Sequence, residues 1–306
     1  MKRKVYIFII ILIFTSIAHS CVNTGSKNDK DLFEVALSEN WDEVERMIKN
    51  KADVNAKNEM GVTVLMIACS FEKKEIVELL IEKGADVNAE SLSYETPLTM
   101  SINGGNIEIT RLLINNGADV NKPNNAWNSP LMIASLLDEN ELIEILIENG
   151  ADINVQDKVS GHTALQFICS NGNYEMVKLF IENGADADLR SHNGNTPIML
   201  ALRHNHFEIA KLLFANIDES SYTNTEKLML YSYFGDLNKV KKLVIDKKTN
   251  PDASILGFTP LLFAIHAENI EIIDFLIKEG ADSNIKNEYD GISANDLAEE
   301  KGIDLN

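Results

Sequence analysis

The residues of this sequence that could do chemistry are its histidines and cysteines, and their spacing decides what they can do. Beyond the first twenty residues the histidines are His162, His192, His204, His206 and His266. None forms an i, i+4 pair with a second ligand residue in a metal-binding motif. The sequence also lacks a G-x-S-x-G motif, a Walker loop, a dinucleotide fingerprint and an H-E-x-x-H motif. We therefore expect no enzyme activity, no metal and no cofactor. A metal-dependent protein that uses the histidines is the alternative, and metal analysis of the purified protein would decide between the two.

Cys21 lies at the end of a segment whose pattern predicts a processing signal. Basic residues 2–4 precede an unbroken apolar run over residues 5–14, which is shorter than the roughly 20 residues that span a bilayer. This pattern is typical of a secretory signal peptide over residues 1–20. The segment 17–21, Ile-Ala-His-Ser-Cys, resembles the lipobox of bacterial lipoproteins. The resemblance implies export, cleavage before Cys21, lipid attachment to Cys21 and a membrane anchor on the periplasmic or cell-surface side. A plain secreted protein and an uncleaved anchor are the alternatives.

The composition is that of a folded, strongly acidic protein. The 306 residues include 28 Lys+Arg and 47 Asp+Glu, a net charge of −19, and 45% are hydrophobic. Removal of residues 1–20 would leave 25 basic against 47 acidic residues, or −22. This charge argues against nucleic acid and against anionic lipid, since both are bound by clustered Lys and Arg. We expect a protein partner that is neutral or basic, and contact with a membrane only through a lipid at Cys21. We also expect a monomer.

One pattern recurs along the rest of the chain. The sequence Gly-Ala-Asp occurs at Gly84, Gly117, Gly150, Gly184 and Gly280. The first three spacings between successive copies are 33, 33 and 34 residues. A degenerate copy, Lys51-Ala52-Asp53, lies 33 residues before Gly84. About a dozen residues after Lys51 and after the first four glycines comes a second marker, Thr-Pro-Leu or a close variant, which begins at Thr63, Thr96, Ser129, Thr163 and Thr196. Thr259-Pro260-Leu261 belongs to the same series.

Each period contains the signals of two helices. At Thr196 the hydroxyl can cap a helix whose first residue is Pro197. A polar turn near 205–206 precedes a second stretch with apolar residues at helical spacing. Asn-Gly pairs normally indicate hairpins, but here they follow amphipathic helical stretches. Glycine as a left-handed helix C-cap is therefore the better interpretation.

This 33-residue unit, opening on Thr-Pro-Leu and closing on Gly-Ala-Asp, resembles the ankyrin repeat. The resemblance implies an all-α repeat solenoid of stacked helix-turn-helix units with finger-like β-turn loops. It assigns residues 21–30 to a polar tether and 31–303 to the repeat domain. The repeats lie near 31–57, 58–90, 91–123, 124–157, 158–190, 191–220, 221–253 and 254–286, with a half-repeat at 287–303. Such units bury their apolar faces only by stacking.

Two departures from the family pattern are visible. The family places a histidine after Thr-Pro-Leu that ties neighbouring loops together, and this chain has Met66, Thr99, Met132, Gln166, Met199 and Leu262 there. Stiffness between repeats is therefore expected to fall. The segment 215–253 lacks both markers, and we expect a helical pair near 225–234 and 238–246 with a shortened or missing finger.

Cys69 and Cys169 occupy equivalent slots three repeats apart, so about 30 Å should separate them. A disulfide needs Cα atoms within about 7 Å, and we expect two buried, unpaired cysteines.

The resemblance also implies that a partner contacts the fingers and the exposed side of the first helices. The finger candidates are Met60, Leu92, Tyr94, Asn125, Trp127, His162, His192 and Phe258, and the first-helix candidates are Phe71, Leu136, Arg203 and His204. Tyr94 and Trp127 replace the finger glycine, and Tyr and Trp are frequent interface hot spots. The expected function is a non-enzymatic protein-binding scaffold. The alternative is a structural spacer or envelope-stability factor without one dominant partner.

Overall fold

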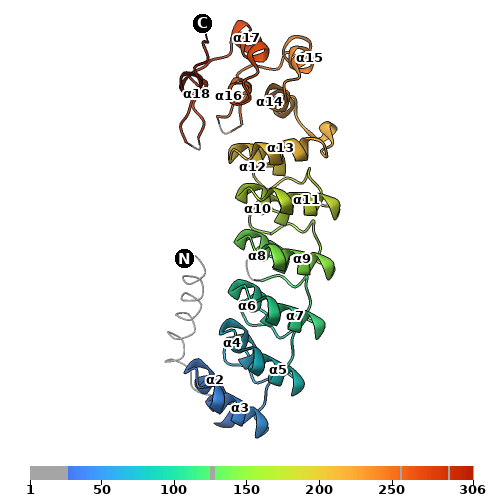
Figure 1. Cartoon of the computed structure of the whole chain (residues 1–306), viewed down its shortest axis with the longest axis vertical. Helices are drawn as coiled ribbons and strands as arrows, with labels where there is room; N and C mark the ends of the chain where they lie inside the picture. The colour runs from blue at the N-terminus through green and yellow to red at the C-terminus, as the bar shows by residue number, and fades with distance from the viewer. Residues whose placement is uncertain (1–26, 125–127, 256, 289, 306) are drawn as a thin grey trace. The chain divides into compact units, whose positions relative to one another are not determined.

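The protein folds into stacked pairs of short helices (Figure 1). The structure is a computed structural model that describes residues 27–124, 128–255, 257–288 and 290–305. Over these residues it has seventeen α-helices and no strand, which confirms the expected all-α repeat solenoid. The chain divides into two compact units, unit 1 up to Asn216 and unit 2 from Ile217.

Unit 1 consists of six helix pairs. They are α2 (Lys27–Leu37) with α3 (Trp41–Lys49), α4 (Val64–Ser70) with α5 (Lys74–Glu82), α6 (Pro97–Gly104) with α7 (Ile107–Asn115), α8 (Pro130–Leu137) with α9 (Asn140–Glu148), α10 (Ala164–Asn171) with α11 (Tyr174–Glu182), and α12 (Pro197–Arg203) with α13 (Phe207–Phe214). Each first helix contacts the first helix of the next pair, so that these helices form one layer and the second helices another.

Short polar side chains determine where the first helices begin. The hydroxyl groups of Thr63, Ser129 and Thr163 each accept a hydrogen bond from the backbone N–H three residues later. Such a cap satisfies one of the N–H groups that a helix start leaves unpaired. At Thr196 the expected cap is wrong, because its buried hydroxyl makes no such bond and only Pro197 marks the start.

The core lies mainly between the first helices. In α4 all residues from Val64 to Cys69 are buried, whereas α5 buries only Ile76, Val77 and Leu80. Cys69 and Cys169 are free and fully buried, as expected, and burial raises the pKa of both thiols.

An asparagine ladder, formed by Asn55, Asn88, Asn121 and Asn154, links consecutive repeats on the surface. Each side chain donates to the carbonyl of the following repeat's Gly-Ala-Asp glycine and accepts from the N–H of its aspartate. At Asn88 these two bonds measure 2.8 Å each. The next equivalent residue is Asp188, whose carboxylate has no N–H to donate.

Unit 2 begins with the irregular repeat. A 3-10 turn, η1 (Glu219–Ser221), leads into α14 (Asn224–Phe234), α15 (Leu237–Lys241) and a π-helical turn, η2 (Lys242–Asp246). The expected helical pair in this segment is confirmed. A regular pair, α16 (Pro260–His266) and α17 (Ile270–Lys278), and the single helix α18 (Ala294–Lys301) follow.

The first described helix starts earlier than expected. Helix α2 begins at Lys27, so residues 27–30 of the segment assigned to the tether are helical. Cys21 and the proposed signal peptide lie outside the described residues. Among the helices that the structure describes, none has the length and apolar character needed to cross a membrane.

Candidate functional site

The loops that precede the first helices form fingers, and neighbouring fingers are joined through their backbones. The N–H of Leu92 donates to the carbonyl of Met60 at 2.8 Å, and that of His192 donates to the carbonyl of Ser160 at 2.8 Å. Within a finger, the N–H of Asn58 closes the turn on the carbonyl of Val62 at 3.1 Å. The side chains at the tips are therefore carried by a hydrogen-bonded framework.

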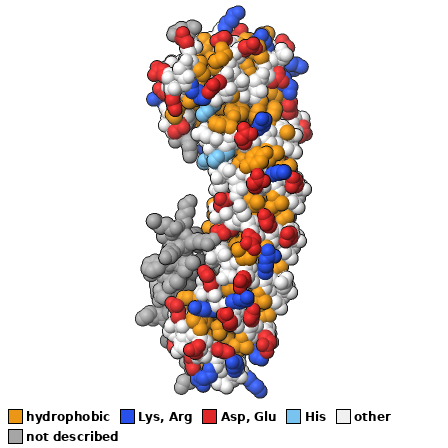
Figure 2. Space-filling view, in the orientation of Figure 1, with side chains coloured by type: hydrophobic (Ala, Val, Ile, Leu, Met, Phe, Trp, Pro, Cys, Tyr) orange, Lys and Arg blue, Asp and Glu red, His pale blue; other side chains and the backbone are white. Residues whose placement is uncertain are grey.

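Hydrophobic side chains reach the surface of unit 1 between its charged groups (Figure 2). In the finger over residues 91–95, Leu92 is 68% exposed and Tyr94 is 48% exposed. Tyr94 has a φ of 59°, in the left-handed region that the finger glycine occupies in other repeats. The expectation that a tyrosine replaces this glycine at an exposed tip is confirmed.

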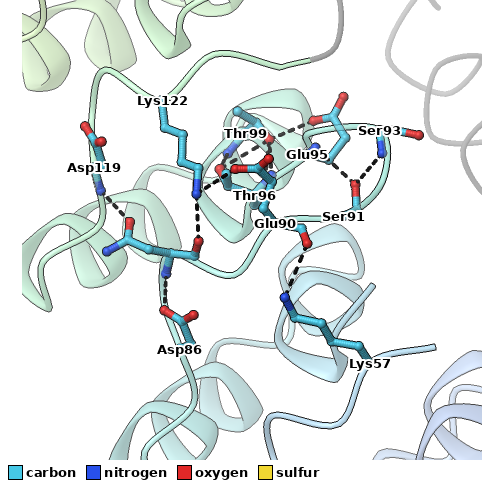
Figure 3. Close-up of polar contacts among 11 residues, drawn as sticks. Lys57, Asp86, Glu90, Ser91, Ser93, Glu95, Thr96, Thr99, Asp119 and Lys122 are labelled. Atoms are coloured by element: carbon cyan, nitrogen blue, oxygen red, sulfur yellow. Dashed lines mark hydrogen bonds and ion pairs between the residues drawn. The ribbon is translucent and has the colours of Figure 1, made fainter. Parts of the chain in front are cut away.

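Polar contacts hold this finger from within (Figure 3). The Ser91 hydroxyl accepts from the N–H groups of Ser93 and Glu95 at 3.2 and 3.1 Å. The Thr99 hydroxyl donates to the Glu95 carboxylate at 2.7 Å. Burial raises the pKa of Glu95 and outweighs the opposing effect of this bond. The finger therefore presents Leu92 and Tyr94 from a fixed loop.

A lysine from the next repeat braces the base of the same finger. The Lys122 ammonium lies 2.7 Å from the Glu90 carboxylate and donates to the Asn88 carbonyl at 3.1 Å. Both side chains of this ion pair are about one-third exposed. The pair therefore connects the finger to its neighbour rather than projecting toward a ligand.

The finger of the fifth repeat is organised by one carboxylate. Asp157 accepts from the N–H groups of Val159, Ser160 and His162 and from the Ser160 hydroxyl, all within 2.8 Å. Burial would raise the pKa of Asp157, but these hydrogen bonds outweigh it and leave the pKa below its usual value. A carboxylate in this role shapes the loop and is not a free base.

Two histidines meet at this finger and the next. The Nδ1 atom of His162 lies 2.6 Å from the Ser160 hydroxyl, whose only proton goes to Asp157. His162 Nδ1 therefore carries the proton and donates, as does His192 Nδ1 to the Val159 carbonyl at 3.2 Å. Burial lowers the pKa of His162, Asp157 opposes this shift and His192 adds to it. Over the described residues no group of three or more His, Cys, Asp or Glu side chains could hold a metal ion.

At one position Gln166 takes the role expected of the family histidine that this chain lacks. Gln166 is fully buried, and its amide donates to the carbonyls of Asn195 at 2.7 Å and Leu189 at 3.2 Å, in the following finger. Its oxygen accepts from the N–H of Thr163 at 2.9 Å. Gln166 therefore links this pair of repeats through buried hydrogen bonds. The sequence held one signal of these hydrogen bonds, a polar residue at a buried position that the other repeats fill mostly with Met.

The structure divides the predicted binding residues into three groups. The exposed ones are Leu92, Tyr94, Leu136 and His192, and the partly buried ones are Met60, Phe71, His162, Arg203 and His204. The prediction that Phe258 lies on the binding surface is wrong, because this residue is only 7% exposed and its ring stacks on Phe263 in the core of unit 2. Asn125 and Trp127 lie outside the described residues.

The contacts of the partly buried residues limit what they can offer to a partner. The Phe71 ring packs on Trp41 with centroids 5.7 Å apart, and the His204 ring stacks on His206 at 6.2 Å. Val159, which the sequence analysis did not select, is 74% exposed at its fingertip. The 34-residue step from Gly150 to Gly184, one longer than the steps before it, was the signal of an enlarged finger here.

Comparison with models of known protein families finds ankyrin repeats in both units. A model described as ankyrin repeats in three copies matches residues 10–91, 90–157 and 131–224. A model of a single ankyrin repeat matches residues 256–288. No curated protein matches the chain. The matches thus cover the regular repeats on both sides of the irregular segment that contains α15 and η2.

Proposed function

Because the chain belongs to the ankyrin-repeat family, we propose that it is a non-enzymatic scaffold that binds a partner protein through the fingers and first helices of unit 1. The observation that carries this proposal is the finger over residues 91–95. It presents Leu92 and Tyr94 to solvent on a loop held by Ser91, Glu95 and Thr99. A rigid exposed aromatic loses little conformational freedom on binding, which favours its use as an anchor.

The backbone of Tyr94 supports the same proposal. A side chain in the left-handed region costs about 1–2 kcal/mol relative to glycine. Equivalent positions in other repeats hold Gly61, Gly161 and Gly194, so the fold itself is satisfied by glycine there. A strained residue that the fold does not need points to a role outside the fold.

The charges near this surface indicate the kind of partner. Exposed acidic side chains lie at the ends of two first helices, Glu72 and Asp138, and in the second finger, Glu59. Apolar anchors with acidic neighbours favour a partner that has apolar side chains and neutral or basic surroundings.

Tyr94→Gly separates binding from folding. We expect this variant to gain about 1 kcal/mol of stability, because the strained residue becomes glycine. It should lose partner capture by about tenfold or more, because a hot-spot ring is removed. The measurement is quantitative pull-down from cell-envelope extract with the wild type, Tyr94→Gly and Tyr174→Ala as baits.

Tyr174 is the matched control, since it is an exposed tyrosine that lies on the second helix α11. Equal recovery of the partner by wild type and Tyr94→Gly would contradict the proposed contact surface. Absence of any saturable partner for all three baits would instead support the spacer alternative.

We further propose that the protein is exported and carries lipid on Cys21. The basic residues 2–4, the apolar run 5–14 and the lipobox-like segment 17–21 support this proposal. Mass spectrometry of the mature N-terminus should find a chain that begins at an acylated Cys21. A chain that begins at an unmodified residue would support plain secretion, and one that retains residues 1–20 would contradict cleavage.

A further inference from the structure

The second helix of the irregular repeat differs in charge from the corresponding helices of the other repeats. Residues 237–248 contain five lysines and one aspartate. Among the other second helices that the structure describes, α3, α5, α9, α11 and α17 are net acidic, while α7 and α13 are neutral. A protein with a net charge of −19 therefore carries a local excess of basic residues at 237–248. We call it the α15 patch, made of Lys239, Lys241, Lys242, Lys247, Lys248 and Ile245.

The π-helical turn η2 results from one additional residue. Lys248 has a φ of 51° and takes the left-handed position after the helix that Gly280 takes after α17. Eleven positions separate Leu237 from Lys248, whereas ten separate Ile270 from Gly280. The N–H of Lys247 accordingly donates to the Lys242 carbonyl, five residues back, at 3.2 Å. Such single π-turns occur frequently at functional sites.

The inserted residue brings an isoleucine to the surface. In five other repeats the isoleucine near the end of the second helix is partly buried, as Ile81, Ile114, Ile147, Ile181 and Ile277 show. In η2, Val244 stays in the core and Ile245 is 57% exposed. Lys241 precedes Ile245 by four residues, about one helical turn, and Lys242, Lys247 and Lys248 lie within three residues of Ile245 along the chain. The exposed isoleucine is therefore flanked by cations.

Two lysines of the α15 patch contact other side chains of the protein, and the other three face solvent. Lys239 pairs with Glu219 at 3.0 Å and lies over the Tyr231 ring, and Lys241 lies over the Phe275 ring. Lys242, Lys247 and Lys248 are exposed and form no ion pair with any residue that the structure describes. Lys and Arg side chains are visible along the edge of unit 2 that carries α15 (Figure 2). At least three cationic groups next to Ile245 thus face solvent.

We propose that the α15 patch docks on a membrane surface rich in anionic phospholipid. Lysine is a flexible point charge that suits a diffuse layer of headgroup phosphates, and an exposed aliphatic side chain can enter the acyl boundary. An acidic protein partner would favour Arg, Tyr or Trp anchors, and residues 237–248 contain none of them. The net charge of the chain is screened beyond about 8–10 Å, so the local lysines dominate at contact. This proposal departs from the expectation, based on the acidic composition, that the chain does not bind anionic lipid. This proposal does not depend on the function proposed for unit 1.

Co-sedimentation of the full chain with lipid vesicles tests the proposal. The probes are vesicles of phosphatidylcholine alone and vesicles with about 30% phosphatidylglycerol. Wild type should bind the anionic vesicles at least about tenfold more tightly, and this preference should fall as salt rises from about 50 to 200 mM. The triple variant Lys242→Glu/Lys247→Glu/Lys248→Glu should lose the preference. Ile245→Ser should weaken binding at every salt concentration, because it removes an apolar contact.

The matched control is Lys178→Glu/Lys211→Glu/Lys278→Glu. It makes the same change in net charge at exposed lysines of three other second helices and should bind as wild type does. Residues 5–14 are the same in every variant, so differences between variants report on the patch. Urea unfolding midpoints establish that all of them fold.

Equal binding of wild type to both vesicle types would overturn the proposal, as would equal losses in the patch and control variants. A soluble acidic polypeptide, poly-glutamate, provides the second arm. If the patch variant loses binding to poly-glutamate while the wild type ignores anionic vesicles, the patch binds acidic protein and the lipid proposal fails.

Discussion

Gly257→Ala should destabilise unit 2 by about 3–5 kcal/mol, whereas Gly291→Ala should cost only about 1–2 kcal/mol. Both glycines hold the same slot, two residues before a helix cap, with φ values of 77° and 74°. A Cβ atom at Gly257 would clash with the Lys286 carbonyl oxygen and lie 2.7 Å from Asn287 Cα. At Gly291 nothing lies within 4 Å.

Both variants place a side chain on a left-handed backbone. Only Gly257→Ala also brings its Cβ atom against the backbone of the next finger. The difference in stability between them therefore measures how tightly one finger packs on the backbone of the next. Calorimetric or urea unfolding of the two variants gives this difference. Equal losses would show that the finger over 286–291 moves aside at little cost, and the close approach would then not be a constraint on the fold.

Gln166→Met should cost about 2–4 kcal/mol, although it hardly changes the volume of the side chain. The substitution leaves the buried Thr163 N–H and the partly buried Leu189 carbonyl without their hydrogen-bond partners, and a loss of this kind costs about 1–3 kcal/mol when the group is buried. The Asn195 carbonyl loses one of its two donors but keeps the N–H of Ser191. Urea unfolding of the full chain measures the effect.

Met132 supplies the control, because it occupies the same slot one repeat earlier and is fully buried. Met132→Leu keeps the volume and removes no hydrogen bond, so it should cost less than about 1.5 kcal/mol. A Gln166→Met variant as stable as wild type would show that the amide adds nothing to the docking of the following finger.

The sequence predicted the repeated architecture well because its signals are local and recur. Thr or Ser with Pro begins a first helix, and glycine ends a second one, by rules that need no knowledge of neighbouring repeats. Repetition of these signals distinguished the Asn-Gly helix caps from hairpins. The irregular segment was predicted for the same reason, since both signals disappear there together and helical spacing remains.

Features that depend on contacts across repeats were not predictable in the same way. Phe258 lies in a finger sequence, and only its stacking on Phe263 makes it a core residue. The extra residue in α15 and η2 could be placed only once Lys248 was seen in the left-handed position of Gly280. The binding surface was predicted in part, since Leu92, Tyr94 and Leu136 are exposed while Val159 was missed.

The asparagine ladder has a consequence for how opening of the array can be followed by hydrogen exchange. Asp86, Asp119, Asp152 and Asp186 are exposed residues, yet the backbone N–H of each is held by an asparagine of the preceding repeat at 2.7–2.8 Å. Separation of two neighbouring repeats breaks this bond and opens the amide to exchange with deuterium. Four amides therefore report separately on four successive junctions, so that protection read along the chain would show at which end of unit 1 the stack comes apart first.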